Sequence, residues 1–109
     1  MKKNRDDKVL SFFLREMQEQ LGAQLKQVIL FGSRARGDFA FDSDYDCLAI
    51  VDEPVSNVKD TIDEIAGDLL FEYNAVLSVF PVSEEAYRQR VYNPLFMNIR
   101  REGIELLNG

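Results

Sequence analysis

The stretch from Gly32 to Val51, GSRARGDFAFDSDYDCLAIV, joins two apolar segments through a polar loop. The segment before it, residues 25–31 (LKQVILF), ends in four consecutive apolar residues, and the loop leads into a second apolar run, residues 44–52 (DYDCLAIVD). Short unbroken apolar runs are typical of strands that are buried on both faces. The sequence therefore predicts two buried strands, joined by a loop that can hold one helical turn.

The spacing of apolar residues elsewhere places the remaining elements around these two strands. Helical spacing predicts helices over residues 6–21, closed by Gly22, and over residues 57–73. Residues 75–82 predict a third strand with Pro81 at its end or on a sheet edge, and Ser83 caps a helix that Asn93-Pro94 interrupts. A last helix is expected over residues 95–107. The long connection between the second and third strands favours a helical crossover, so the predicted fold is α/β, with a small mixed sheet flanked by helices.

Length and composition fit one compact domain over residues 1–109. Hydrophobic residues make up 46% and charged residues 29%, and a net charge of -6 argues against a surface that coats nucleic acid. No apolar stretch reaches the about 18 residues of a membrane span, and the N-terminus lacks the apolar region of a signal peptide. Cys47 is the only cysteine and histidine is absent. We therefore expect a cytoplasmic protein without a histidine-activated nucleophile.

The Gly32-Ser33 pair follows directly on the first predicted strand. Glycine allows a sharp turn there and lets a ligand approach backbone amides that a side chain would shield. If Ser33 to Arg36 form a helical turn, its first N–H groups point outward toward a phosphate, with charge added by Arg34 and Arg36. The alternative is a plain turn at the end of a strand with solvated arginines, which is the usual meaning of an isolated Gly-Ser pair.

Asp44 and Asp46 stand two residues apart at the start of the second predicted strand. Strand alternation sends both side chains to one face, with alpha carbons about 6.8 Å apart. Oxygen ligands of this kind suit Mg²⁺, which binds one or two carboxylates together with substrate phosphates and waters. The alternative makes Asp44 a turn residue and Asp46 a solvated edge position. Because Asp46 runs straight into a buried strand, a metal or an arginine partner is favoured. Ser43 is expected to cap or orient the loop and is a candidate nucleotide-binding residue.

The two motifs together resemble the signature of the DNA polymerase beta-like nucleotidyltransferase superfamily, and the layout over residues 25–107 resembles its minimal nucleotidyltransferase branch. The resemblance implies that Gly32 and Ser33 hold the β- and γ-phosphates of a nucleoside triphosphate. It also implies that Asp44 and Asp46 are catalytic and bind Mg²⁺, with Arg34 or Arg36 assisting on the phosphates. The segment NIRREGIELL, residues 98–107, is similar to the closing helix of such proteins.

The third predicted strand departs from the family pattern. Active relatives usually carry a third carboxylate there, whereas the matching place in AVLSVFPV holds Ser78, and Glu72 upstream is expected to be solvated. The chain is thus either a slow or specialised transferase or a degraded one that still binds nucleotide.

The resemblance implies a transferase that moves a nucleoside monophosphate, AMP from ATP, onto a hydroxyl. Minimal nucleotidyltransferases commonly pair with HEPN-domain proteins, so the implied role is that of an antitoxin that adenylylates a tyrosine of its HEPN toxin partner. The alternative is a nucleotide-binding protein that neutralises a partner by contact alone. A transferase acting on a small molecule ranks last, because we expect no second substrate-binding domain. The sequence leaves open whether the chain forms homo- or hetero-oligomers.

Overall fold

The computed structural model describes residues 7–37, 44–52 and 54–108, and its centre is a four-stranded mixed sheet in the order β3-β2-β1-β4. The strands are β1 (Leu25–Phe31), β2 (Tyr45–Val51), β3 (Leu77–Ser83) and β4 (Ile104–Asn108). Strand β1 runs antiparallel to β2 and to β4, whereas β2 and β3 are parallel. The predicted α/β fold with a mixed sheet is confirmed.

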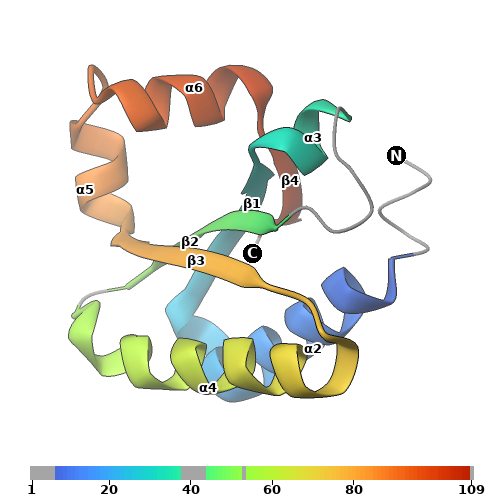
Figure 1. Cartoon of the computed structure of the whole chain (residues 1–109). Helices are drawn as coiled ribbons and strands as arrows, with labels where there is room; N and C mark the ends of the chain where they lie inside the picture. Colours follow the sequence, from blue (N-terminus) through green and yellow to red (C-terminus); the bar gives the residue numbers. More distant parts are fainter. Residues whose placement is uncertain (1–6, 38–43, 53, 109) are drawn as a thin grey trace.

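Helices cover both faces of this sheet (Figure 1). On one face lie α2 (Lys8–Leu21) and α4 (Ser56–Tyr73), and on the other lie α5 (Glu84–Gln89) and α6 (Pro94–Glu102). The short helices η1 (Gly22–Gln24) and α3 (Ser33–Arg36) flank β1 at its two ends. Helix α4 is the predicted crossover, since parallel neighbours such as β2 and β3 need a connection that returns the chain to the same end of the sheet. Within the described residues, every helix is too short or too polar to cross a bilayer.

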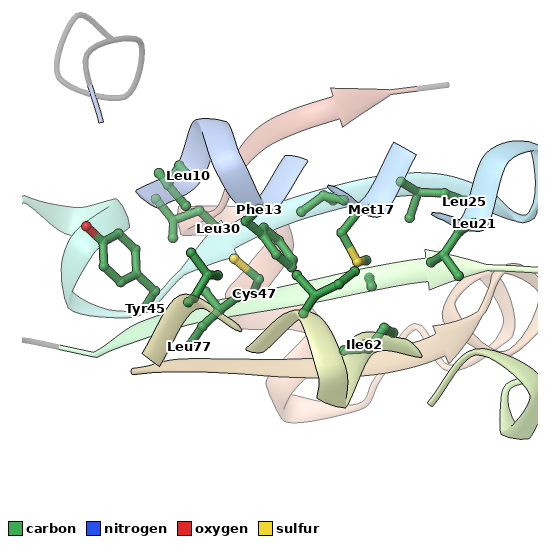
Figure 2. Packing of buried hydrophobic residues seen from close by; sticks show 14 of the residues in the cluster. Leu10, Phe13, Met17, Leu21, Leu25, Leu30, Tyr45, Cys47, Ile62 and Leu77 are labelled. Carbon is green, nitrogen blue, oxygen red and sulfur yellow. The ribbon is translucent and has the colours of Figure 1, made fainter. Parts of the chain in front are cut away.

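The larger core lies between the sheet and helices α2 and α4. Phe13 and Met17 of α2 are fully buried and pack beside Cys47 of β2 and Ile62 of α4, as Figure 2 shows. The predicted helix α2 is confirmed, with Asp7 as its N-cap accepting a hydrogen bond from the Leu10 amide at 3.0 Å. This layer fixes one face of β1 and β2 and leaves the opposite face for a second, smaller core.

The smaller core lies under α5 and α6. Ile29, Leu48 and Ile50 of the sheet pack there against Phe96 and Ile99 of α6. The predicted cap at Ser83 is confirmed, since its hydroxyl accepts from the Ala86 amide at 3.1 Å. At Asn93, where the sequence predicted only a break between helices, the side chain caps α6 by accepting from the amides of Leu95 and Phe96. This core lies on the face of the sheet opposite the larger core.

The prediction of one helix over residues 95–107 was wrong in its second half. Helix α6 ends at Glu102, and Ile104–Asn108 form strand β4 on the outer side of β1. The Gly103 amide closes the helix by donating to the Ile99 carbonyl oxygen at 2.8 Å. The physical reason is the unpaired edge of β1, whose backbone groups gain partners only if the chain leaves the helix and extends.

Candidate functional site

Gly32 and Asp46 are in direct contact at the ends of the two central strands. Phe31 of β1 pairs with Asp46 of β2, so the turn that leaves β1 lies beside the acid that enters β2. Gly32 has a φ of +79° and a ψ of -157°, a conformation that is essentially confined to glycine. A Cβ at Gly32 would lie 2.6 Å from Asp46 Oδ2. The structure therefore brings together the two motifs that the sequence singled out.

The two acids share one electrostatic environment. Burial raises the pKa of the Asp46 carboxyl, and the negative charge of Asp44 raises this pKa further. Asp46 is half-buried at the start of β2, whereas Asp44 is exposed immediately before the strand. Two carboxylates so placed repel each other without a cation between them. The arrangement therefore favours the binding of a cation at this end of the sheet.

The predicted helical turn after Gly32 is confirmed as α3. The Gly32 carbonyl oxygen accepts from the amides of Ala35 and Arg36, both at 3.1 Å, and the Gly37 amide donates to the Ser33 carbonyl oxygen at 2.9 Å. The Ser33 amide lies ahead of these first intrahelical hydrogen bonds, at the helix end where amides lack partners within the helix. The turn thus places backbone donors next to Gly32 and the Asp46 carboxylate.

The two arginines of α3 contact groups outside this pair of acids. The Arg34 guanidinium lies over the Tyr45 ring, 3.9 Å from its centroid, and Arg36 is 3.7 Å from a carboxylate oxygen of Glu102 in α6. Tyr45 belongs to the core under α2 and α4, whereas its neighbour Asp46 points to the other face. A phosphate role for Arg34 or Arg36 stays a prediction.

Sequence reasoning missed the support that Tyr45 gives to the site. Its hydroxyl donates to Asp7 Oδ2 at 2.9 Å, so the N-cap of α2 is tied to the residue between the two acids. Burial and this hydrogen bond raise the pKa of Tyr45 to about 12. The available signal was Asp7 at the position just before a helical pattern, but its partner lies 38 residues away.

Ser78 occupies the place beside Asp46 on the third strand, as the sequence predicted. The parallel register pairs Asp46 with Ser78 and Leu48 with Phe80. Glu72 is exposed at the end of α4, as expected. Asp52 forms an ion pair with Lys26, with 3.6 Å between its carboxylate oxygen and the ammonium nitrogen, and lies at the other end of β2 from the two acids. Ser43 lies outside the described residues, so its predicted role in the loop stays a prediction.

The residues present fit a magnesium ion held with its substrate. Among the described residues, no group of three or more acidic or cysteine side chains lies close enough together to hold a metal ion. At this end of the sheet the described carboxylates that could bind one are those of Asp44 and Asp46. Mg²⁺ needs only one or two carboxylates when waters and substrate phosphates complete its octahedron. Asp46 packs against the backbone of Gly32, so the acid lies next to the amides at the start of α3, which are suitable donors for such phosphates. Burial raises the pKa of the Cys47 thiol, which keeps it protonated and unsuited as a nucleophile.

Comparison with known proteins identifies the family. A family model described as "Nucleotidyltransferase domain" matches residues 10–94. The chain belongs to the nucleotidyltransferase domain family. This nucleotidyltransferase domain is similar to two proteins of Methanocaldococcus jannaschii, each named "putative protein adenylyltransferase". One is 30% identical over 98 residues, covering 90% of this chain and 94% of the relative, and the other is 30% identical over 99 residues, covering 90% and 95%.

Solved structures share the fold of this nucleotidyltransferase domain. A chain from the crystal structure of a toxin–antitoxin with AMP-PNP superposes with a TM-score of 0.67 at 17% identity, covering 91% of this chain and 73% of the other. A chain from the tri-AMPylated Shewanella oneidensis HEPN toxin in complex with its MNT antitoxin superposes with a TM-score of 0.58 at 16% identity, covering 100% and 74%. At such identities the likeness concerns the fold.

Proposed function

We propose that this nucleotidyltransferase domain is a magnesium-dependent protein adenylyltransferase. It moves AMP from ATP onto a tyrosine hydroxyl of a HEPN-domain toxin encoded nearby, and thereby acts as the antitoxin. The observation that carries the proposal is the contact between Gly32 and the Asp46 carboxylate, which puts the turn after β1 and its backbone amides next to a pair of acids. Relatives named as protein adenylyltransferases and the toxin–antitoxin complexes of the same fold support the reaction and the kind of partner.

In this proposal the chain itself performs binding and alignment. The amides at Gly32 and Ser33 hold the β- and γ-phosphates, while Asp44 and Asp46 hold Mg²⁺. The bound ion supplies positive charge that offsets the charge developing on the phosphates. The acceptor oxygen forms a bond to the α-phosphorus, the bond from that phosphorus to the oxygen bridging to the β-phosphate breaks, pyrophosphate leaves and the hydroxyl proton passes to water. Alignment and electrostatic stabilisation lower the barrier without a covalent enzyme intermediate.

A second candidate function is neutralisation by binding alone. The observation that favours it is Ser78, since β3 offers a hydroxyl and no carboxylate beside Asp46. In this alternative the domain binds nucleotide and covers its partner without transferring AMP.

Labelled ATP separates the two functions. The chain and the HEPN-domain protein encoded beside it are incubated with ATP labelled on the α-phosphate and with Mg²⁺, and label on the partner is counted. We expect transfer that falls more than about 100-fold in Asp44→Asn and Asp46→Asn, since each change removes charge stabilisation at the reacting phosphate. Asp52→Asn is the matched control, because Asp52 follows the same strand but is 3.6 Å from Lys26. Absence of label, with neutralisation of the toxin that survives both changes, would establish the binding function instead.

A further inference from the structure

Phe80 of β3 is a half-exposed aromatic side chain on the same sheet face as Asp46. Because β2 and β3 pair in register, Ser78 lies beside Asp46 and Phe80 lies beside Leu48, two residues further from the strand start. Alternation along β3 turns Ser78 and Phe80 to one face. Phe80 is 46% exposed, and its ring contacts the Phe31 ring at 6.1 Å between centroids with 42° between the planes. The Phe31 and Phe80 rings together form an aromatic shelf next to Asp46, on the face of the sheet that carries this acid.

The helices on this face partly cover Phe31, which packs against the smaller core, and leave Phe80 half-exposed. Tyr87 of α5 and Phe96 and Ile99 of α6 pack with Ile29, Leu48, Ile50 and Val82. Figure 1 shows α5 at the end of β3, α6 further back over β1, and α3 at the end of β1. Large apolar side chains on a buried face usually sit under a covering element. Phe80 keeps almost half of its surface exposed at the one end of the face that adjoins the acids.

The strand order fixes which substrate approaches this shelf. Gly32 and Ser33 follow β1, on one side of Asp46, and Ser78 and Phe80 belong to β3, on the other side. Displacement at phosphorus places the entering and leaving oxygens on opposite sides of the phosphorus. If the leaving pyrophosphate occupies the β1 side, the acceptor must arrive over β3. The first groups that it meets there are the Ser78 hydroxyl and the Phe80 ring.

We infer that Phe80, together with Ser78, selects an acceptor with an aromatic hydroxyl. The inference rests on the proposed function and names the residues that determine its acceptor class. A phenol ring stacks on Phe80 in offset or edge geometry, which directs its hydroxyl toward Ser78 and Asp46. Strand β3, LSVFPVS, carries no carboxylate that could take up a proton beside the acceptor. A phenol, with a pKa near 10, loses its proton far more readily than an aliphatic alcohol and so depends less on such a base.

A binding experiment tests the shelf without requiring turnover. The chain is saturated with Mg²⁺ and α,β-methylene ATP, whose α–β linkage resists transfer, and is titrated with N-acetyl-tyrosinamide or N-acetyl-serinamide while amide chemical shifts are followed by NMR. We expect saturable binding of the tyrosine probe, with shifts in Ser78 and Phe80, and no saturation by the serine probe. Phe80→Ala should weaken binding of the tyrosine probe about three- to tenfold, the effect of losing one aromatic pair. Phe80→Tyr should restore it.

The matched control is Phe71→Ala, which removes an aromatic ring that is 86% exposed on α4. It should leave the dissociation constants of the tyrosine probe and of α,β-methylene ATP unchanged. Equal binding of the two probes, or a tyrosine probe unaffected by Phe80→Ala, would overturn the inference. Weaker binding of α,β-methylene ATP in Phe80→Ala, with the tyrosine probe unaffected, would overturn it by assigning the ring to the nucleobase. Failure of the unmodified chain to bind magnesium nucleotide would instead contradict the proposed function, so the two failures are distinct.

Discussion

At the residue scale, Gly32 meets two separate requirements of the site. Its backbone has a φ of +79° and a ψ of -157°, a region that other residues enter only under strain, and the space where a Cβ would stand is taken by Asp46 Oδ2 at 2.6 Å. The backbone conformation is a requirement of folding, whereas the missing Cβ makes room for the Asp46 carboxylate. A substitution at this position therefore tests whether the contact serves binding as well as stability.

Gly32→Ala should destabilise the fold by about 1–3 kcal/mol from backbone strain and weaken binding of magnesium ATP more than tenfold, because the new methyl displaces the Asp46 carboxylate. Chemical denaturation and calorimetry measure the two effects. Gly22→Ala is the control: Gly22 also has a positive φ, +56°, yet among the described residues no atom lies within 4 Å of the added Cβ. That variant should lose stability and keep its nucleotide affinity. Equal affinities in Gly32→Ala and the unmodified chain would argue against a phosphate cradle at this turn.

At the element scale, the switch from α6 to β4 completes the sheet. Gly103 sits at the junction, where a Cβ would lie 2.5 Å from the Ile99 carbonyl oxygen and 2.6 Å from Ile29 Cγ2. Its φ of -71° is ordinary, so the reason for glycine here is the close approach of helix and strand and not backbone conformation. The same junction brings the end of α6 close to β1, the strand that carries the Gly32 turn.

We expect Gly103→Ala to destabilise the protein by about 1–3 kcal/mol, because the added methyl overpacks the contact between α6 and β1. Urea unfolding at neutral pH measures the change. The comparison variant is Gly67→Ala in the interior of α4, where no described atom lies within 4 Å of the added Cβ. It should stabilise the protein by about 0.5–1 kcal/mol through higher helix propensity. A Gly103→Ala protein as stable as the unmodified chain would mean that the junction is looser than the structure describes.

At the scale of the whole molecule, one hydrogen bond links the first helix to the central strand next to the acids. The Tyr45 hydroxyl donates to Asp7 at 2.9 Å, and burial together with this bond raises the pKa of Tyr45 to about 12. The unfolded chain releases the phenol proton near pH 10. Between about pH 10 and 12 the folded state therefore binds more protons than the unfolded state, and the free energy of unfolding falls as the pH rises through that window.

The Tyr45→Phe variant should lose about 1 kcal/mol at neutral pH, because the Asp7 carboxylate loses its hydrogen-bond donor. Between pH 10 and 12 its free energy of unfolding should then fall by about 2 kcal/mol less than that of the unmodified chain, since no phenol remains at this position to titrate. Urea unfolding at several pH values measures both. Tyr92→Phe provides the control, as Tyr92 is 85% exposed, and its pH profile should match that of the unmodified chain. Parallel profiles for Tyr45→Phe and the unmodified chain would contradict the assigned link.

How much of the site could be read from the sequence depended on distance along the chain. The Gly-Ser turn and the two acids lie within one short stretch, and each has a local signature that makes it recognisable. The aromatic shelf could not be read in the same way, because Phe31 and Phe80 come from strands that meet only through β2. Tyr45 looked like an ordinary strand residue, since its partner Asp7 belongs to another element.

The sequence by itself determined the elements whose signals are local: the amphipathic helices, the buried strands β1 and β2, the cap at Ser83, and the position of Ser78 in β3. Only the tertiary structure decided that residues 104–108 form a strand, that Arg34 lies against Tyr45, and that Phe80 stays half-exposed beside Leu48. The physical reason is that periodicity and capping depend on neighbours along the chain. Pairing of a strand edge and exposure of a ring depend on which distant segments arrive beside it.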